Sequence, residues 1–284
     1  MNKAGHLSTT SDGNGKAGFG SILQLQLLLY AYCKLNRVEY CFTDFKNIAH
    51  NLDNAQQDFD QNLTKFVNLP KSISTLEKSD MQEHYLMNQF VRRNISLLKK
   101  IISTLYYRIN YSGPLYFQDS FFNIALHIRV WNSWDQKNNS NFFSENIYKR
   151  EIYFEGLNQH NFNYYKSAID LAVAQANKPV KLHIFSQGRI EDFNDFSDYN
   201  IEYHLNEDLI PTFYHLVISD VLIASKSSLS WSAHLYGINK FVIARADYWQ
   251  PWYGGTILLN KNGKRTPKFL IAIKQIFMKI KVTF

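Results

Sequence analysis

The second half of the chain alternates short apolar runs with helical patterns, and this alternation limits the possible folds more than any other feature of the sequence. The apolar runs, each about as long as a strand, are 123–130, 180–185, 201–205, 221–224 and 240–243. The segments with a helical pattern lie between them, within 153–178 and over 210–219 and 228–236. Strands that alternate with helices predict an α/β fold with a parallel, Rossmann-like sheet.

The first half of the chain has weaker patterns. We expect a helix over 21–33, a strand over 38–42, short helices within 44–70 and a long helical region over 80–109. Residues 1–20 are interpreted as a flexible or truncated lead-in. The dipeptide Gly113-Pro114 is a turn signal. We therefore predict an N-terminal α/β domain of residues 1–115 and a C-terminal Rossmann-like domain of residues 116–284.

Composition excludes some classes of protein and favours others. The formal net charge of +7 suits a phosphate-bearing substrate or an anionic membrane surface. The Lys and Arg residues are scattered and no nucleic-acid motif occurs, so nucleic-acid binding is not expected. Two cysteines, Cys33 and Cys41, favour a reducing compartment, and residues 1–20 have no apolar signal-peptide core. These features predict a cytoplasmic protein.

One motif with glycines precedes a predicted helix, and one motif with an arginine ends a predicted strand. Gly18 and Gly20 stand directly before the first predicted helix, where they permit close approach of a ligand to a helix N-terminus. A plain glycine-rich turn explains them equally well. His127 and Arg129 lie on one face at the end of the strand 123–130. An arginine there can bind a diphosphate through two hydrogen bonds, or it can pair with a carboxylate.

Two hydroxyl-rich turns follow other predicted strands. Ser225, Lys226, Ser227 and Ser228 separate the strand 221–224 from a helix, which is the arrangement of a phosphate cradle. Ser227 or Ser228 could also cap the helix, and one turn can do both. The pair Ser186-Gln187 follows the strand 180–185 and could hydrogen-bond a nucleotide base or ribose.

In order along the chain, these segments resemble the inverting fucosyltransferase superfamily. That group includes α-1,2-fucosyltransferases, nodulation and core α-1,6-fucosyltransferases, and protein O-fucosyltransferases. The matching segments are GFGSILQ (18–24), LHIR (126–129), HIFSQ (183–187) and SDVLIASKSSLSWSAHLYG (219–237). The resemblance spans about residues 18–243, and the last segment is its most specific part.

The resemblance implies a GT-B fold with two Rossmann-like lobes and an interdomain cleft. It implies transfer of fucose from GDP-fucose to a glycan acceptor, without a metal or other cofactor. The absence of a paired-carboxylate D-x-D motif at a strand end agrees with metal independence. Arg129 and His127 are the implied catalytic residues. The implied donor-binding residues are Gly18, Gly20, Ser186, Gln187, Ser225, Lys226, Ser227 and Ser228.

The chain also departs from the family pattern. His127-Ile128-Arg129 continues into Val130-Trp131-Asn132 where α-1,2 enzymes have a second Arg and then Gly-Asp. Ser186-Gln187 replaces an acidic pair, and we expect no strand before the glycines. These departures leave open another nucleotide-linked donor, such as a pentose or deoxysugar, and an inactive nucleotide- or sugar-binding relative.

The last segment, from Lys268 to Phe284, has apolar residues at helical spacing from 269 to 280, with lysines among them. It is too short and too charged to cross a bilayer. It is interpreted either as a terminal helix packed on the second domain or as an interfacial helix that contacts anionic lipid. Peripheral membrane contact is thus the alternative to a purely cytoplasmic protein.

Overall fold

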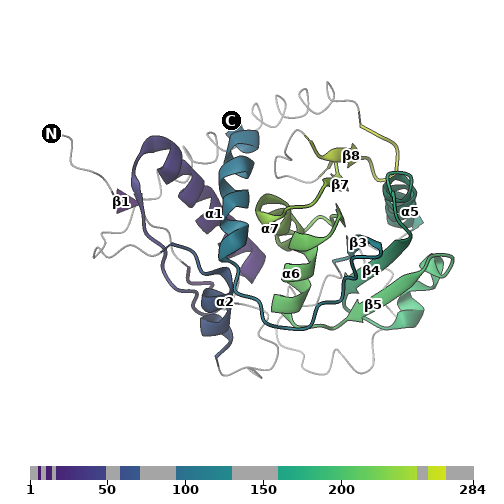
Figure 1. The fold of residues 1–284 in the computed structure, drawn as a ribbon, viewed down its shortest axis with the longest axis horizontal. Helices are drawn as coiled ribbons and strands as arrows, with labels where there is room; N and C mark the ends of the chain where they lie inside the picture. The colour runs from purple at the N-terminus through teal and green to yellow at the C-terminus, as the bar shows by residue number, and fades with distance from the viewer. Residues whose placement is uncertain are drawn as a thin grey trace.

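The computed structural model describes residues 6–7, 11–14, 17–48, 58–70, 94–129, 159–247 and 255–266. They form a mixed α/β structure in which helices flank a six-stranded parallel sheet (Figure 1). The strands are β3 (Phe122–His127), β4 (Val180–Ser186), β5 (Ile201–Leu205), β6 (Val221–Ile223), β7 (Phe241–Arg245) and β8 (Ile257–Leu259). The predicted parallel, Rossmann-like sheet is therefore confirmed.

The strand order defines where a ligand site is expected. The sheet runs β5-β4-β3-β6-β7-β8, and every neighbouring pair is parallel. Counted along the chain, this is the 3-2-1-4-5-6 order of doubly wound folds. In register, Ile124 of β3 lies between Leu182 of β4 and Val221 of β6. The connections reverse direction between β3 and β6, and ligands bind beyond the carboxyl ends of the strands at such a point.

Helices cover both faces of the sheet because side chains alternate along each strand. Ile124 and Leu126 of β3 pack with α5 (Gln159–Val173) and the 3₁₀ helix η5 (Ile190–Phe196). Ala125, between them, faces the opposite core with α6 (Leu209–Ile218) and α7 (Ser228–Tyr236). The buried β6, Val221–Ile223, contributes to both cores, as expected of a central parallel strand.

The N-terminal part contains a short parallel βαβ unit. Strand β1 (His6–Leu7) pairs with β2 (Glu39–Tyr40), and α1 (Phe19–Asn36) connects them. The expectation that no strand precedes the glycines is therefore wrong. A strand of two residues leaves too short a pattern to recognise in sequence. Helix α1 ends at Asn36, and the left-handed backbone of Arg37 turns the chain so that the N–H of Val38 donates to the carbonyl of Cys33 at 2.9 Å.

Other N-terminal helices pack around α1 and α7. They are α2 (Phe59–Val67), a helical segment over 94–103 and the 3₁₀ helix η2 (Thr104–Arg108). Leu23 and Leu27 of α1 belong to the same hydrophobic core as Leu222 of the sheet. Among the described residues, α1 and α7 lie side by side (Figure 1). The domain boundary at 115, the second Rossmann-like lobe and the cleft stay predictions.

Most predicted elements of the second half agree with the structure to within a few residues. The strand expected over 123–130 runs from Phe122 to His127 in the structure. Ile128 and Arg129 lie beyond its end, and Val130 lies outside the described residues. The helix predicted within 153–178 is α5. Strand β8 was not predicted. Its run of three residues, Ile257–Leu259, is too short to stand out in the sequence.

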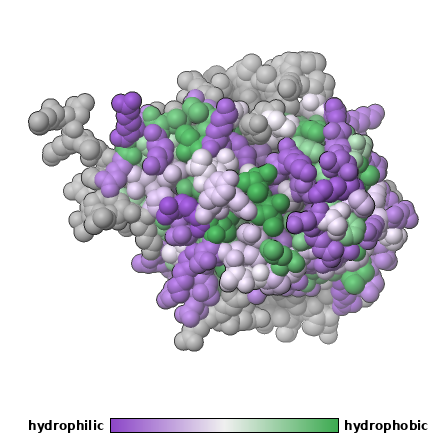
Figure 2. Space-filling model, viewed as in Figure 1, coloured by the Kyte–Doolittle hydropathy of each residue, from purple (hydrophilic) through white to green (hydrophobic). Residues whose placement is uncertain are grey.

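The surface and the chain end bear on possible membrane contact. On the face shown in Figure 2, apolar residues gather near the centre of the view and hydrophilic residues surround them. Within the part of the chain that the structure describes, no helix has the length and apolarity needed to span a membrane. The segment 268–284 lies outside the described residues, so its contact with lipid stays a prediction.

Candidate functional site at the ends of β3 and β6

The candidate site lies where β3 and β6 end, at the reversal point of the sheet. His127 is the last residue of β3, and the Ser225–Ser228 turn separates β6 from α7. Because the two strands are parallel neighbours, their carboxyl ends meet at one edge. Two motifs that are 98 residues apart in the sequence therefore lie in contact through His127 and Ser225.

His127 joins the two strand ends through a buried hydrogen-bond network. Its Nδ1 atom lies 3.0 Å from the hydroxyl of Ser225 and within hydrogen-bond distance of the hydroxyl of Ser230. The two hydroxyls are 3.1 Å apart, and the backbone N–H of Ser225 also donates to Ser230. Burial, helped by the positive charge of Arg129, lowers the pKa of His127 to about 3. The imidazole is therefore neutral at physiological pH.

Arg129 lies two residues beyond His127 and is half-buried. Its charge is near enough to lower the pKa of His127. Ile128, between them, is buried in the core on the α5 face of the sheet, whereas His127 contacts Ser225 and Ser230 on the other side. This agrees with the alternation predicted for these two residues, and the direction of the Arg129 side chain stays a prediction.

The end of β4 joins the same edge. The backbone N–H of Ile128 donates to the carbonyl of Phe185, and the hydroxyl of Ser186 donates to the carbonyl of Ile128 at 2.8 Å. Ser186 is therefore fixed next to the His127–Arg129 segment. Gln187 follows it and is half-buried, and its carbonyl accepts a second, longer hydrogen bond from Ser186. The structure brings Ser186 into the site through its backbone contact with Ile128.

The glycine motif brings the start of α1 against the start of α7. Gly20 lies so close to α7 that an added Cβ would be 2.5 Å from the backbone nitrogen of Leu229. Beside this contact, the hydroxyls of Ser21 and Ser228 are 3.0 Å apart, and Ser232 donates to the carbonyl of Gly20 at 2.9 Å. Only a residue without a side chain permits this approach. Gly20 thus has a packing role, whatever ligand the motif contacts.

Replacement of Gly20 tests this packing directly. Gly20→Ala should destabilise the fold by about 3 kcal/mol, because the contact is with rigid backbone and not with a movable side chain. The matched change Ser21→Ala, one residue along, removes one hydroxyl contact and should cost about 1 kcal/mol. Urea unfolding followed by circular dichroism measures both values. Equal stability of Gly20→Ala and wild type would show that α1 and α7 are not in close contact.

The remaining motif residues have structural partners of their own. Gly18 is the N-cap of α1, and it cannot supply a side-chain cap. Ser227 caps α7 by accepting a hydrogen bond from the N–H of Leu229 at 3.2 Å, so the capping interpretation is confirmed. Lys226 lies 3.8 Å from a carboxylate oxygen of Asp247. This ion pair connects the Ser225–Ser228 turn to the segment that follows β7.

Asp247, one of the general bases considered from the sequence, lies next to the Ser225–Ser228 turn through its ion pair with Lys226. Its carboxylate accepts two hydrogen bonds of 2.8 Å from Arg245. Burial alone would raise its pKa, but the hydrogen bond and charge of Arg245, together with Lys226, leave the pKa below the usual value. A carboxylate that has a lowered pKa and already accepts two hydrogen bonds from an arginine is a poor proton acceptor. Of the other bases considered from sequence, Asp44 is exposed, and His50 and Asp135 lie outside the described residues.

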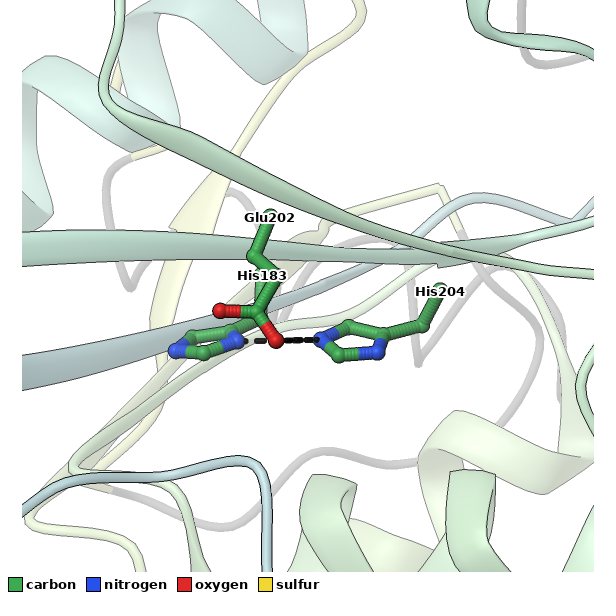
Figure 3. Close-up of side chains that lie close together, drawn as sticks. All are labelled: His183, Glu202 and His204. Atoms are coloured by element: carbon green, nitrogen blue, oxygen red, sulfur yellow. Dashed lines mark hydrogen bonds and ion pairs between the residues drawn. The ribbon is translucent and has the colours of Figure 1, made fainter.

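Sequence reasoning missed Ser230, although it completes the network around His127. Ser230 lies in the first turn of α7, where its spacing from Ser225 could have suggested that both hydroxyls point to one place. Potential metal ligands do not gather at this edge among the described residues. The one group of three potential ligands among the described residues is His183, Glu202 and His204, which lie within β4 and β5 and not at this edge (Figure 3).

Comparisons of the chain with protein-family models, with curated proteins and with solved structures found no match. The functional interpretation therefore depends on the geometry of this edge and on the motifs that form it.

Proposed function

We propose that this chain is an inverting glycosyltransferase that transfers a sugar from a nucleotide-sugar donor to a glycan hydroxyl, with GDP-fucose as the best candidate donor. The observation that supports it is the meeting of three motifs at the reversal point of a doubly wound sheet. His127–Arg129, the Ser225–Ser228 turn and the start of α1 at Gly20 lie in one continuous set of contacts. The proposal includes a GT-B arrangement with the acceptor bound by the N-terminal part.

In the proposed reaction, the acceptor oxygen forms a bond to the anomeric carbon while the bond from that carbon to the diphosphate oxygen breaks, and the acceptor hydroxyl gives up its proton to solvent. Negative charge then develops on the departing diphosphate. Arg129 carries a permanent positive charge at the edge where nucleotides bind in such sheets. The N–H groups at the start of α7 and the hydroxyl of Ser228 provide further favourable dipoles. These groups stabilise the leaving group without a metal ion.

We assign His127 a positioning role within this mechanism. A pKa of about 3 and an Nδ1 atom occupied by two serine hydroxyls make it unsuitable as the base that accepts the acceptor proton. Its contacts instead fix Ser225 against the end of β3. This fixes the distance between the Arg129 backbone and the phosphate-binding turn, which is the geometry that catalysis of this kind requires.

A donor panel tests the proposal. The purified chain is incubated with GDP-fucose and with UDP- and dTDP-linked deoxysugars and pentoses, and release of nucleoside diphosphate is measured with and without glycan acceptors. One preferred donor is expected. Release with another donor would retain the class but change the sugar. Binding of GDP without release from any donor would indicate an inactive binding relative instead.

Metal removal provides an independent check. We expect the initial transfer rate in excess EDTA to equal the rate in buffer alone, because Arg129 and the α7 N-terminus supply the positive potential. The control is a titration of Mg²⁺ and Mn²⁺ into the chelated enzyme. Complete loss in EDTA with recovery in either ion would place the protein in a different, metal-dependent class of glycosyltransferase.

A further inference from the structure

Three charged side chains gather where β6 and β7 end, beside the Ser225–Ser228 turn. Arg245 is the last residue of β7, Asp247 follows it by two residues, and Lys226 belongs to the turn itself. Because β6 and β7 are parallel neighbours, their carboxyl ends lie at the same edge of the sheet. The three charges are therefore at the edge where the donor is placed.

Arg245 forms a fixed base for the carboxylate of Asp247. The arginine side chain is only 9% exposed, and its guanidinium lies 5.4 Å from the centre of the Tyr164 ring. Its Nε and one terminal nitrogen donate at 2.8 Å, one to each oxygen of the carboxylate. Two parallel hydrogen bonds of this kind fix both position and orientation. Arg245 is thus committed to Asp247.

Lys226 is held by Asp247 much less tightly than Arg245 is. Its amine lies 3.8 Å from Oδ2 of Asp247, an oxygen that already accepts a hydrogen bond from Arg245. This separation is longer than a direct hydrogen bond. An ion pair of this kind between partly exposed groups contributes little to stability. The flexible stem of a lysine can therefore redirect the amine at small cost.

The charges of this group also favour a change of partner. A diphosphate bound at the Ser225–Ser228 turn would bring several negative charges to the segment that carries Lys226. Since Arg245 is committed to Asp247, Lys226 is the cation of the group that can turn toward the phosphates. When the bond to the anomeric carbon breaks, the diphosphate gains a further negative charge, so its attraction for the amine increases.

We propose that Lys226 changes partners during the reaction: Asp247 holds its amine in the unliganded protein, and the donor diphosphate takes the amine over on binding. Asp247 is then a positioning residue, because it acts through Lys226 and does not touch the reacting atoms. The inference rests on the proposed function, and it adds the group that competes with the diphosphate for this cation. The same competition favours release of the nucleoside diphosphate after transfer.

Binding of GDP and of pyrophosphate to the full-length chain tests this exchange, measured by calorimetry at about 0.15 M salt. Asp247→Asn removes the competing charge and keeps an oxygen that can accept from Arg245. Both ligands should then bind roughly threefold to fivefold more tightly. Loss of a merely structural residue would weaken binding or leave it unchanged. Asp247→Glu restores the charge and should return the affinity toward that of the wild type.

Lys226→Met tests the other half of the exchange and leaves the hydrogen bonds between Arg245 and Asp247 in place. It should weaken binding of GDP and pyrophosphate about tenfold, because a charged contact with phosphate is lost. In this background, Asp247→Asn should tighten binding by less than about twofold, since the amine for which the carboxylate competes is gone. Equal GDP affinity of Lys226→Met and wild type would overturn the proposal.

The matched control is Asp220→Asn. Asp220 pairs with Lys240 at 2.7 Å, and these two residues directly precede β6 and β7, at the opposite edge of the sheet. The change removes the same charge and should leave GDP affinity unchanged. Thermal unfolding establishes that each variant is folded.

The proposal is overturned if Asp247→Asn binds GDP no more tightly than Asp220→Asn does. It is also overturned if Asp247→Asn tightens binding equally with and without Lys226, because the carboxylate would then act by general repulsion. The proposed function is tested separately by the donor panel. The expected binding changes without turnover of any donor would retain the exchange and remove the transferase function, and turnover without these changes would do the reverse.

Discussion

Lowering the pH from 7.5 to 5 is expected to reduce the free energy of unfolding by about 4–6 kcal/mol, from three buried histidines alone. Burial lowers the pKa of His127 and His234 to about 3 and that of His215 to about 4. Arg129 adds to the effect at His127, and Lys99 adds to it at His234. In the unfolded chain each imidazole titrates near 6.5. The stability is therefore complete above about pH 6.5.

As the pH falls below 6.5, the unfolded chain binds protons that the folded protein cannot accept until its own, lower pKa values are reached. Each such histidine then costs about 1.4 kcal/mol per pH unit. Natural domains have about 5–15 kcal/mol in total, so the loss should bring this protein close to unfolding. Urea unfolding followed by circular dichroism, in EDTA and at a series of pH values from 8 to 5, measures the effect.

A single substitution provides the control for this pH dependence. Nε2 of His215 accepts a hydrogen bond from the N–H of Tyr116, which leaves its Nδ1–H to donate to the carbonyl of Pro211 at 2.8 Å. His215→Asn retains a donor toward Pro211 and removes the titrating ring. The slope of stability against pH should fall by about 1.4 kcal/mol per pH unit. Equal stability of the wild-type protein at pH 7.5 and 5.5 would contradict the burial of neutral histidines.

The sheet could be predicted from sequence because its strands leave a local pattern. Residues 221–224 are wholly apolar, since β6 is covered on both faces. The meeting of His127 with the Ser225 turn could also be anticipated. Parallel strands bring their carboxyl ends to one edge, so chain distance is no obstacle. What sequence could not provide was the order of the strands, which depends on the packing of whole βα units.

The contacts that complete the candidate site depend on packing between distant helices. The approach of Gly20 to Leu229 requires α1 and α7 to lie side by side, and no local pattern in either helix encodes that. The group of His183, Glu202 and His204 inside the sheet is hidden for a similar reason. Glu202 and His204 are two residues apart on a strand, but His183 joins them only through the register of β4 against β5. That pairing depends on how the two strands lie in the folded sheet, and neither strand shows it by itself.

Replacement of Arg129 by alanine should reduce kcat of the proposed transfer reaction by roughly 10²–10³-fold, or about 3–4 kcal/mol of transition-state stabilisation. Negative charge develops on the diphosphate as the bond to the anomeric carbon breaks, so a cation at this edge acts more strongly on the transition state than on the bound donor. The effect should therefore appear mainly in kcat and less in KM. Initial rates with saturating donor and acceptor measure it.

Two further variants make the Arg129 result specific. Arg129→Lys keeps the charge but loses the planar fork that binds two phosphate oxygens, so it should recover only part of the activity. Arg265→Ala removes an exposed arginine next to β8 and should leave kcat unchanged. Circular dichroism and thermal unfolding establish that all three variants are folded. Turnover by Arg129→Ala at the rate of Arg265→Ala would mean that the guanidinium at the end of β3 does not stabilise the leaving diphosphate.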